Sequence, residues 1–455
     1  MKKISQLIFA SCCFFFSGFS QDLRKAPAQN RLIDGHPAWI MQGNIYEVNT
    51  RQYTPEGTLN EFAEQLDRLK AMGVQTLWFM PLNPISKTDR KGTLGSYYAV
   101  SDYTALNPEY GVMADWIKMV KTIHGKGMKV IIDWVPNHTG ADNHWLTEHP
   151  DFFVKDSTGK AAMAVDWADT RQLDYNNMEM QDSMIAAMKF WIDLSNIDGF
   201  RCDVAWNVPA AFWSRCIPEL KKKKAGIFML AEGDKTYLPP SGFDAIYPWN
   251  MFSMMKKVAA GERPAFGLDS AFHEIDSLYP PNTIEMYFTS NHDENSWNKA
   301  DYGVFPGAEH APFAVFTQTM ARGVPLIYGG QEEPVLRALP FFEKDSIHFE
   351  HYARAAFYKT LLGLRKRDPA LSPDAGFKKV LAGNDSSVYA FVREKAGRKV
   401  LVILNLSNRE QAISIKEKSL RGNPLNVFMH RREPVSSRSW KMEPWGYAVY
   451  EYGAE

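Results

Sequence analysis

The sequence has 455 residues, of which 45% are hydrophobic and 13% aromatic, and its 52 Lys and Arg residues balance 52 Asp and Glu residues. A chain of this length and composition buries a substantial core and suits one large domain plus a smaller one, which excludes a disordered or collagen-like protein. The balanced charge argues against a nucleic-acid partner, because nucleic-acid binding favours a basic excess clustered on one face.

The first twenty residues have the pattern of a secretory signal peptide. Lys2 and Lys3 precede an apolar run over Ile4–Phe19, which closes on small residues before polar Gln21. The run is too short and wrongly flanked for a stable membrane span. We therefore expect residues 1–20 to be removed and the protein to be exported to a periplasm, a cell surface or the medium.

The cysteines bear on export and on stability. A lipoprotein with Cys12 or Cys13 lipidated is the alternative to a cleaved signal peptide, although the apolar run continues past both residues. After cleavage only Cys202 and Cys216 remain, so stability is expected to come from the core rather than from disulfides. No other segment is apolar for long enough to be a transmembrane segment.

Beyond the leader, short apolar runs alternate with amphipathic helical stretches, which is typical of parallel β/α units. Eight runs are predicted as strands: Asn44–Glu47, Thr76–Met80, Lys129–Asp133, Gly199–Val204, Phe228–Glu232, Phe243–Tyr247, Thr283–Ser290 and Pro325–Tyr328. The helical stretches between them include Leu59–Met72, Ala114–Lys126, Gln181–Ser195 and Pro209–Lys222. This pattern predicts an α/β fold, a (β/α)8 TIM barrel with its chemistry at the C-terminal ends of the strands.

Two regions depart from the β/α pattern. Residues 138–174, after the third strand, are long, irregular and rich in Trp, Asp and His, which predicts an inserted loop domain beside the active site. After about residue 373 short alternating segments predict a C-terminal antiparallel β-sandwich: Ser387–Val392, Lys399–Asn405, Ala412–Ile415 and Ala448–Tyr452. The expected domains are the barrel (residues 21–137 and 175–372), the insert (138–174) and the C-terminal domain (373–455).

Four segments place polar residues at the end of an apolar strand: VIIDWVPNH (residues 130–138), DGFRCDVA (198–205), FMLAEGD (228–234) and FTSNHDE (288–294). A buried ionisable group is costly unless it is paired or functional. Side chains alternate along a strand, so Arg201 and Asp203 point the same way, and the guanidinium is expected to keep a neighbouring nucleophile ionised.

These groups suit glycoside hydrolysis, which needs two carboxyl groups about the scissile bond, one ionised and the other protonated. In a retaining enzyme the two lie roughly 5 Å apart, a spacing that neighbouring barrel strands supply. Metal-assisted hydrolysis is the rival use of Asp and His clusters, but the sequence contains no HExxH and no close Cys/His ligand spacing.

With these four motifs in order, the chain resembles the α-amylase family of glycoside hydrolases (family 13), from about Ile45 to the neighbourhood of Glu455. The resemblance implies that Asp203 is the nucleophile and that Glu232 is the general acid/base. It implies that Asp293 is a third carboxylate, which grips sugar hydroxyls and helps to distort the ring.

The resemblance also implies substrate-binding residues. Arg201 would orient Asp203, while His138 and His292 would hydrogen-bond the sugar being cleaved. In SYYAVSDY (residues 96–103), Tyr98 occupies the position whose ring stacks on that sugar, with Tyr97 as its competitor. Further candidates carry a less specific signal: Asp133, expected to be structural; Trp134, Trp206 and Trp297, as sugar platforms or core residues; and Glu333 and Arg337 near the last strand.

The family's calcium pattern is incomplete. Many members hold Ca²⁺ with the residue matching Asn137, a loop aspartate and a backbone carbonyl from a His shortly after the nucleophile. Here Gln172 replaces the aspartate and Asn207 replaces the histidine. A hard cation prefers charged oxygen ligands, so no metal or other cofactor is expected to be required, although bound calcium stays open.

The sequence therefore predicts an exported, retaining hydrolase of α-1,4-glucosidic bonds in starch-like α-glucans or maltooligosaccharides. The alternatives within the family are an α-glucosidase, a cyclodextrin- or pullulan-degrading enzyme and a 4-α-glucanotransferase. A non-catalytic carbohydrate-binding protein on the same fold is the rival of another class. It is disfavoured because all three carboxylates and Arg201 are present.

Overall fold

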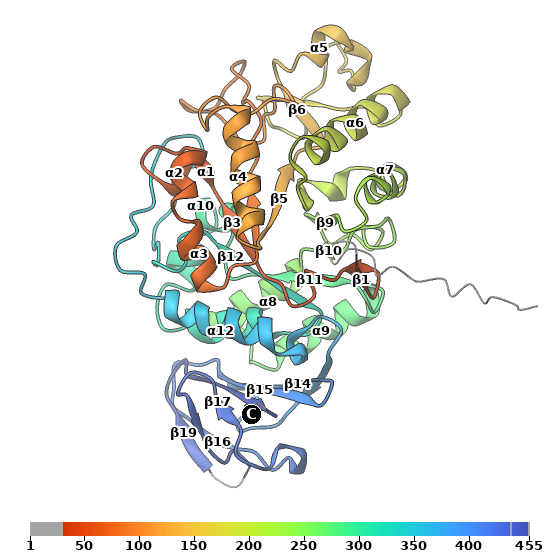
Figure 1. Cartoon of the computed structure of the whole chain (residues 1–455). Coiled ribbons are helices and arrows are strands. Elements are labelled where there is room, and N and C mark those ends of the chain that lie inside the picture. The colour runs from red at the N-terminus through yellow and green to blue at the C-terminus, as the bar shows by residue number, and fades with distance from the viewer. Residues whose placement is uncertain (1–30, 437–438, 454–455) are drawn as a thin grey trace, which may run out of the picture.

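The computed structural model describes residues 31–436 and 439–453, so the predicted signal peptide (residues 1–20) and both of its cysteines lie outside the described residues. Eight parallel strands form a closed barrel in chain order (Figure 1). They are β3 (Ile45–Val48), β4 (Thr76–Phe79), β5 (Lys129–Trp134), β8 (Gly199–Cys202), β9 (Phe228–Ala231), β10 (Ala245–Ile246), β11 (Ile284–Tyr287) and β12 (Gly323–Tyr328). Each coincides with a predicted run, and the predicted barrel is confirmed.

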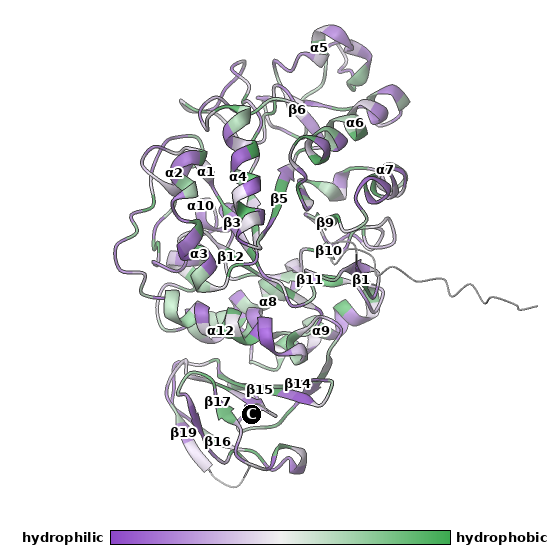
Figure 2. Cartoon of the chain, viewed as in Figure 1, coloured by the Kyte–Doolittle hydropathy of each residue, from purple (hydrophilic) through white to green (hydrophobic). Residues whose placement is uncertain are grey.

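Helices surround the barrel: α1 (Thr50–Tyr53), α2 (Leu59–Ala63), α3 (Leu66–Met72), α4 (Met113–Gly125), α6 (Met178–Ser195), α7 (Ala210–Lys223), α8 (Trp249–Ala259), α9 (Gly267–Leu278), α10 (His292–Ser296), α11 (His310–Thr319) and α12 (Ala355–Arg367). The stretch predicted as one helix over Leu59–Met72 is broken between α2 and α3. Both pieces bury the same apolar face, so the periodicity continues across the break. In Figure 2 these helices carry both hydrophilic and hydrophobic colour, as expected for helices with one buried face.

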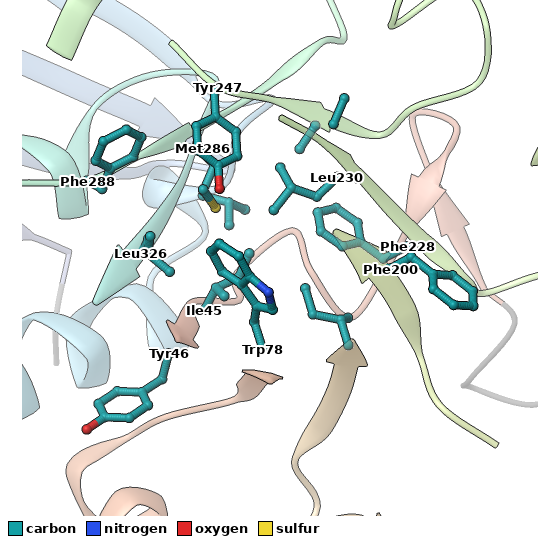
Figure 3. Close-up of a cluster of buried hydrophobic side chains, with 14 of the residues drawn as sticks. Ile45, Tyr46, Trp78, Phe200, Phe228, Leu230, Tyr247, Met286, Phe288 and Leu326 are labelled. Atoms are coloured by element: carbon teal, nitrogen blue, oxygen red, sulfur yellow. The ribbon is translucent and has the colours of Figure 1, made fainter. Parts of the chain in front are cut away.

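Large apolar side chains fill the barrel. Trp78 on β4 is fully buried and lies close to Ile45 of β3 in the core, with Tyr247 above it (Figure 3). Tyr46, the neighbour of Ile45, points away from this cluster and donates its hydroxyl hydrogen to Glu332 Oε1 (2.7 Å). The alternation along β3 thus separates an inner from an outer face.

The insert after β5 lies at the end of the barrel opposite the C-terminal domain (Figure 1). Its strands β6 (His138–Gly140) and β7 (Thr170–Gln172) pair antiparallel. Between them lie α5 (Trp145–Glu148) and the 3-10 turn η2 (Pro150–Phe152). The pairing of β6 with β7 fixes His138, the first residue of the insert, beside the barrel.

The C-terminal domain is antiparallel, as predicted. Its six-stranded sheet has the order β13 (Gly376–Lys379), β14 (Val388–Lys395), β15 (Arg398–Asn405), β20 (Tyr447–Tyr452), β17 (Leu425–Asn426) and β18 (Arg431–Arg432). A second sheet pairs β16 (Gln411–Ser414) with β19 (Ser439–Met442), and Leu401 of the first sheet and Ile413 of the second belong to one buried cluster.

The smaller elements are the β1–β2 hairpin (Leu32–Ile33 and His36–Pro37), the 3-10 turns η3 (Ala205–Asn207), η5 (Pro369–Leu371) and η6 (Lys418–Leu420), and the π-turn η4 (Ala300–Val304). Cys202 and Cys216 are buried and form no disulfide. Over residues 31–436 and 439–453, no helix has the length and apolar character that a membrane crossing needs.

Candidate active site

The C-terminal ends of the barrel strands open into a cavity of about 350 Å³. Five of the residues predicted from sequence line it: Tyr98, His138, Asp203, Glu232 and Asp293. The other two, Arg201 and His292, are buried and contact its lining residues. Strand ends far apart in the sequence thus converge on one site, as barrel geometry requires.

Arg201 joins the carboxyl groups. Its Nη1 lies 2.9 Å from both Asp203 Oδ1 and Asp133 Oδ1, and its Nη2 lies 3.2 Å from Glu232 Oε2. Asp133, expected to be structural, binds Arg201 and accepts from the Tyr98 hydroxyl (3.0 Å). One buried guanidinium therefore holds the two predicted reacting carboxyl groups and a third acid.

The site contains more acids than bases. The carboxyl groups around its cations Arg201 and His292 are those of Glu47, Asp133, Asp203, Glu232 and Asp293, and elsewhere in the lining Lys91 pairs with Asp169. Burial raises the pKa of Asp203 well above its ordinary value, the Glu232 carboxylate adds to the rise, and Arg201 opposes it. Burial also raises the pKa of Asp133 to about 6, against the effect of Arg201.

These shifts modify the expectation that Arg201 keeps Asp203 ionised. Arg201 is shared among three carboxyl groups and does not by itself offset the burial of Asp203. A cluster with this excess of carboxyl groups retains a proton to higher pH than separate carboxylates would. Retention of a proton is the condition for one carboxyl to act as an acid while another acts as a nucleophile.

His292 is held by acids at both ring nitrogens. Its Nδ1 lies 2.5 Å from Glu47 Oε1, and its Nε2 lies 3.2 Å from Asp293 Oδ2 and 2.7 Å from the Tyr98 hydroxyl. Burial disfavours the charged ring, but Asp293 and Glu47 outweigh it and raise the pKa of His292 well above its usual range. Burial likewise disfavours the Asp293 carboxylate, but His292 lowers the pKa of Asp293 below its ordinary value.

His138 has the opposite character. Burial lowers its pKa to about 4, which leaves the ring neutral near pH 7. Its Nδ1 faces the side-chain amide of Asn137 (3.2 Å), whereas its buried Nε2 has no hydrogen-bond partner. An amide N–H donating to Nδ1 places the ring proton on Nε2, where it is available to a ligand in the cavity.

The structure distinguishes between the two neighbouring tyrosines. Tyr98 lines the cavity and its ring stacks near His292, with centroids 5.5 Å apart. Tyr97 lies outside the cavity lining, and the guanidinium of Arg51 sits 4.2 Å from its ring centroid. Tyr98, the residue predicted, is therefore the one positioned to meet a ligand.

The three tryptophan candidates differ in whether they lie at the cavity. Trp297 lines the cavity and is 53% exposed, while Trp206 is 42% exposed and lies beside Gly233, next to the cavity. Trp134 is fully buried in the core.

The two candidates near the last strand lie away from the cavity lining. The Glu333 carboxylate accepts from the backbone N–H of Tyr352 (2.9 Å). Arg337 pairs with Asp345.

Sequence reasoning missed several residues of the site. Glu47 stands near the end of apolar β3, the same signal that singled out the other acids, and it could have been found that way. The remaining missed residues lie on loops that no periodicity describes: Lys91, Trp167, Asp169, Phe341 and Phe342, all of which line the cavity.

The residues at the family's calcium positions do not fit a cation. Gln172 donates from Nε2 to the Asn137 backbone oxygen (2.9 Å) and to Asn137 Oδ1 (3.2 Å), and Asn207 Nδ2 donates to the same Oδ1 (2.9 Å). Amide N–H groups thus occupy the oxygens that a cation would need. Among the described residues, no group of three or more His, Cys, Asp or Glu side chains is arranged to hold a metal.

Comparisons with known proteins agree with this fold. The model of the α-amylase catalytic domain matches residues 30–168. The chain is 27% identical over 399 residues to alpha-amylase MalA of Haloarcula japonica, an alignment covering 83% of this chain. It superposes on the crystal structure of an alpha-amylase from Lactobacillus plantarum with a TM-score of 0.81 and 27% identity, covering 91% of this chain and 99% of that one.

A noncanonic maltogenic alpha-amylase, AmyB from Thermotoga neapolitana, superposes with a TM-score of 0.79 and 26% identity, covering 92% of this chain and 98% of that one. A closed parallel barrel with an antiparallel C-terminal sheet is thus shared with solved α-amylases. The chain is therefore similar to α-amylases over most of its length, and residues 30–168 match their catalytic domain. It spans 57% of the length of the Haloarcula relative.

Proposed function

We propose that the protein hydrolyses α-1,4-glucosidic bonds of starch-like α-glucans or maltooligosaccharides with retention of configuration. The observation that carries the proposal is the contact of one buried guanidinium, that of Arg201, with both Asp203 and Glu232 at the wall of one cavity. Two carboxyl groups joined by a single guanidinium are close enough for the roughly 5 Å spacing of a retaining pair.

In the first step the Asp203 carboxylate attacks the anomeric carbon while Glu232 donates its proton to the departing glycosidic oxygen. The bond between the anomeric carbon and that oxygen breaks, and a β-glycosyl ester forms on Asp203. In the second step Glu232, now a carboxylate, takes a proton from water, and the resulting hydroxide equivalent displaces Asp203. Asp203 leaves as a carboxylate, and the product has the α configuration.

The surrounding groups bind and orient the sugar. The unpartnered Nε2 of His138 supports a hydrogen bond from its N–H to a sugar hydroxyl, and Tyr98 offers a ring face for stacking. Asp293, with its pKa lowered by His292, is suited to accept hydroxyl hydrogens as a carboxylate. We assign Arg201 to the orientation of Asp203.

The alternatives differ in substrate or acceptor rather than in these residues. An α-glucosidase, an enzyme that degrades cyclodextrin or pullulan, and a 4-α-glucanotransferase all use the same first step. Transfer replaces water by a sugar hydroxyl in the second step. A carbohydrate-binding protein without turnover is disfavoured, because nothing in binding alone requires two carboxyl groups joined by one buried guanidinium.

A time course with maltoheptaose, with every product resolved by chromatography, tests the proposal. Shorter maltooligosaccharides that appear first as α-anomers support retaining hydrolysis. Products longer than the substrate would indicate a transferase. No product from folded protein, under conditions in which the sugar binds, would contradict the hydrolase proposal and favour the binding protein.

We further propose that the protein is exported and needs no metal. The first proposal is supported by the charged and apolar pattern of residues 1–20, and mass determination of the mature N-terminus in its native host tests it. The second is supported by the amide donors of Gln172 and Asn207 at the family's calcium positions.

A further inference from the structure

The loop after β4, residues 87–96, is tied to the loop after β12. Leu94 N donates to Phe342 O (3.0 Å), Thr93 N donates to Glu343 Oε1 (2.9 Å), and the Thr93 hydroxyl donates to Glu343 Oε2. These contacts join segments about 250 residues apart in the sequence. We call residues 87–96 the bridging loop.

The other side of the bridging loop is tied to the insert. Asp89 pairs with Arg171 (2.8 Å between Oδ2 and Nη2), and Lys91 pairs with Asp169 (3.2 Å between Nζ and Oδ1). The bridging loop therefore connects the loop after β12 with the insert, and the three segments make a continuous wall at one side of the cavity, which Lys91, Asp169 and Phe342 line.

The part of the cavity lining formed by Val204 and Glu232 has no such connection. There Glu232 accepts from Val204 N (2.6 Å), and Trp206, packed against Gly233, is 42% exposed. Within the described part of the chain, no hydrogen bond or ion pair joins the segment 232–241 to the insert.

The chemistry of the proposed function sets the orientation of a glucan bound in this cavity. The acid protonates the departing oxygen, so the leaving part of the glucan lies on the Glu232 side. The anomeric carbon that bonds to Asp203 belongs to the part carrying the non-reducing end. That end therefore extends away from Glu232, and the wall made by the bridging loop is the tied part of the cavity lining that it can meet. The small cavity, about 350 Å³ against roughly 300–1,000 Å³ for ligand pockets, agrees with a short glycone part.

Lys91 and Asp169 on this wall have hydrogen-bonding capacity that their contacts within the protein leave unsatisfied. Asp169 is 2% exposed and lines the cavity, yet its Oδ2 is buried without a hydrogen-bond partner. An unsatisfied buried carboxylate oxygen is costly, and a sugar hydroxyl is a donor that would satisfy it. Lys91 Nζ, at the neighbouring Oδ1, has donors left for a second hydroxyl.

We propose that the bridging loop closes the cleft at the non-reducing end, so that the enzyme is exo-acting, and that Lys91 and Asp169 bind hydroxyls of the terminal glucosyl unit. This inference rests on the proposed function and adds the mode of attack and two specificity residues. An open cleft would bind anywhere along a glucan. A walled cleft accepts only chain ends.

The test compares two forms of p-nitrophenyl α-maltoheptaoside, one with a free non-reducing end and one with that end blocked by a 4,6-O-ethylidene group. The free form is expected to release short products from its non-reducing end, and the blocked form to react at least tenfold more slowly. Equal rates on the two forms would overturn the inference and leave the hydrolase proposal standing. No turnover of either form by folded protein would remove the hydrolase proposal and this inference with it.

Variants test the two residues. Lys91→Ala and Asp169→Asn are each expected to lower kcat/KM on the free form about tenfold, mainly through KM, and to reduce the discrimination between free and blocked forms. Lys87→Ala, an exposed lysine on the same loop but outside the cavity lining, is the matched control and should behave as wild type. Unchanged discrimination in folded Asp169→Asn would overturn its assignment.

Discussion

Glu47 Oε1 lies 2.5 Å from Nδ1 of His292. Tyr98 donates its hydroxyl hydrogen to Asp133, so its oxygen is left to accept from Nε2 of His292. Both ring nitrogens therefore donate, and the ring is an imidazolium. Glu47 thus acts on the site through His292 as a positioning residue, although it does not line the cavity.

The first prediction concerns Glu47→Gln. An amide oxygen still accepts from Nδ1 but carries no charge, so the pKa of His292 should fall. Because the imidazolium is the form with both donors, activity should be lost at lower pH than in wild type. We expect the alkaline limb of the profile of kcat/KM against pH to move down by about one unit.

Glu64→Gln, a change at an exposed position at the end of α2, serves as the control and should leave the profile in place. A purely structural role for Glu47 would lower the melting temperature or kcat at every pH alike. An unshifted alkaline limb in folded Glu47→Gln would therefore contradict the positioning role.

The second prediction separates the two reacting carboxyl groups with maltosyl fluoride, whose leaving group needs no protonation. Glu232→Gln should release a burst of fluoride and then stall, because the glycosyl ester on Asp203 forms without an acid but breaks down slowly without a base. Asp203→Asn should show no burst and lose about a thousandfold or more in kcat.

Quenched-flow fluoride release and intact-protein mass spectrometry measure the burst and the trapped ester. Circular dichroism checks that both variants are folded. A burst from Asp203→Asn, or an ester mass on a residue other than Asp203, would reverse the assignment.

Sequence alone could predict the barrel and most of the site for a physical reason. Asp203, Glu232 and Asp293 follow apolar strands, and the C-terminal ends of barrel strands meet at one place, so linear position translates into spatial proximity. Glu47 follows the same rule, but no motif of the family accompanies its strand.

The rest of the cavity could not be predicted in this way. Lys91 and Asp169 meet because two loops cross, and the path of a loop is set by contacts such as that of Thr93 with Glu343 rather than by periodicity. The break between α2 and α3 was hidden for the converse reason, since its apolar pattern continues unbroken.

The third prediction concerns metal removal. Because Gln172 and Asn207 donate to the oxygens of Asn137, chelation should leave the melting temperature unchanged. A cation bound at a hundred times its dissociation constant would stabilise the fold by about 2.7 kcal/mol, a shift that calorimetry resolves readily.

The protein is dialysed exhaustively, and its melting temperature is then measured by calorimetry in millimolar calcium and in excess chelator. Activity on maltoheptaose is followed in parallel. Gln172→Ala, which removes donors to Asn137, should lower the melting temperature in both buffers equally. A fall of several degrees in wild type on chelation would contradict the amide network as the substitute for a metal.

The last prediction concerns a buried acid outside the site. Glu285 on β11 is fully buried, and neither of its carboxylate oxygens has a hydrogen-bond partner. Burial raises its pKa to about 8, with Arg322 opposing. The folded chain therefore binds this proton more tightly than the unfolded chain does. Its contribution to stability is complete below about pH 4.5 and is lost progressively as the pH rises through 8.

Replacing Glu285 by Gln removes the ionisation while keeping the shape. The melting temperature of Glu285→Gln relative to wild type should rise steadily between pH 5 and pH 9, because only wild type then has to bury a charge or take up a proton. The rise in the pKa of Glu285 corresponds to at most about 5 kcal/mol in the free energy of unfolding. Glu262→Gln, at an exposed position, should show no such trend. A constant difference between Glu285→Gln and wild type across this range would mean that Glu285 is not protonated in the fold.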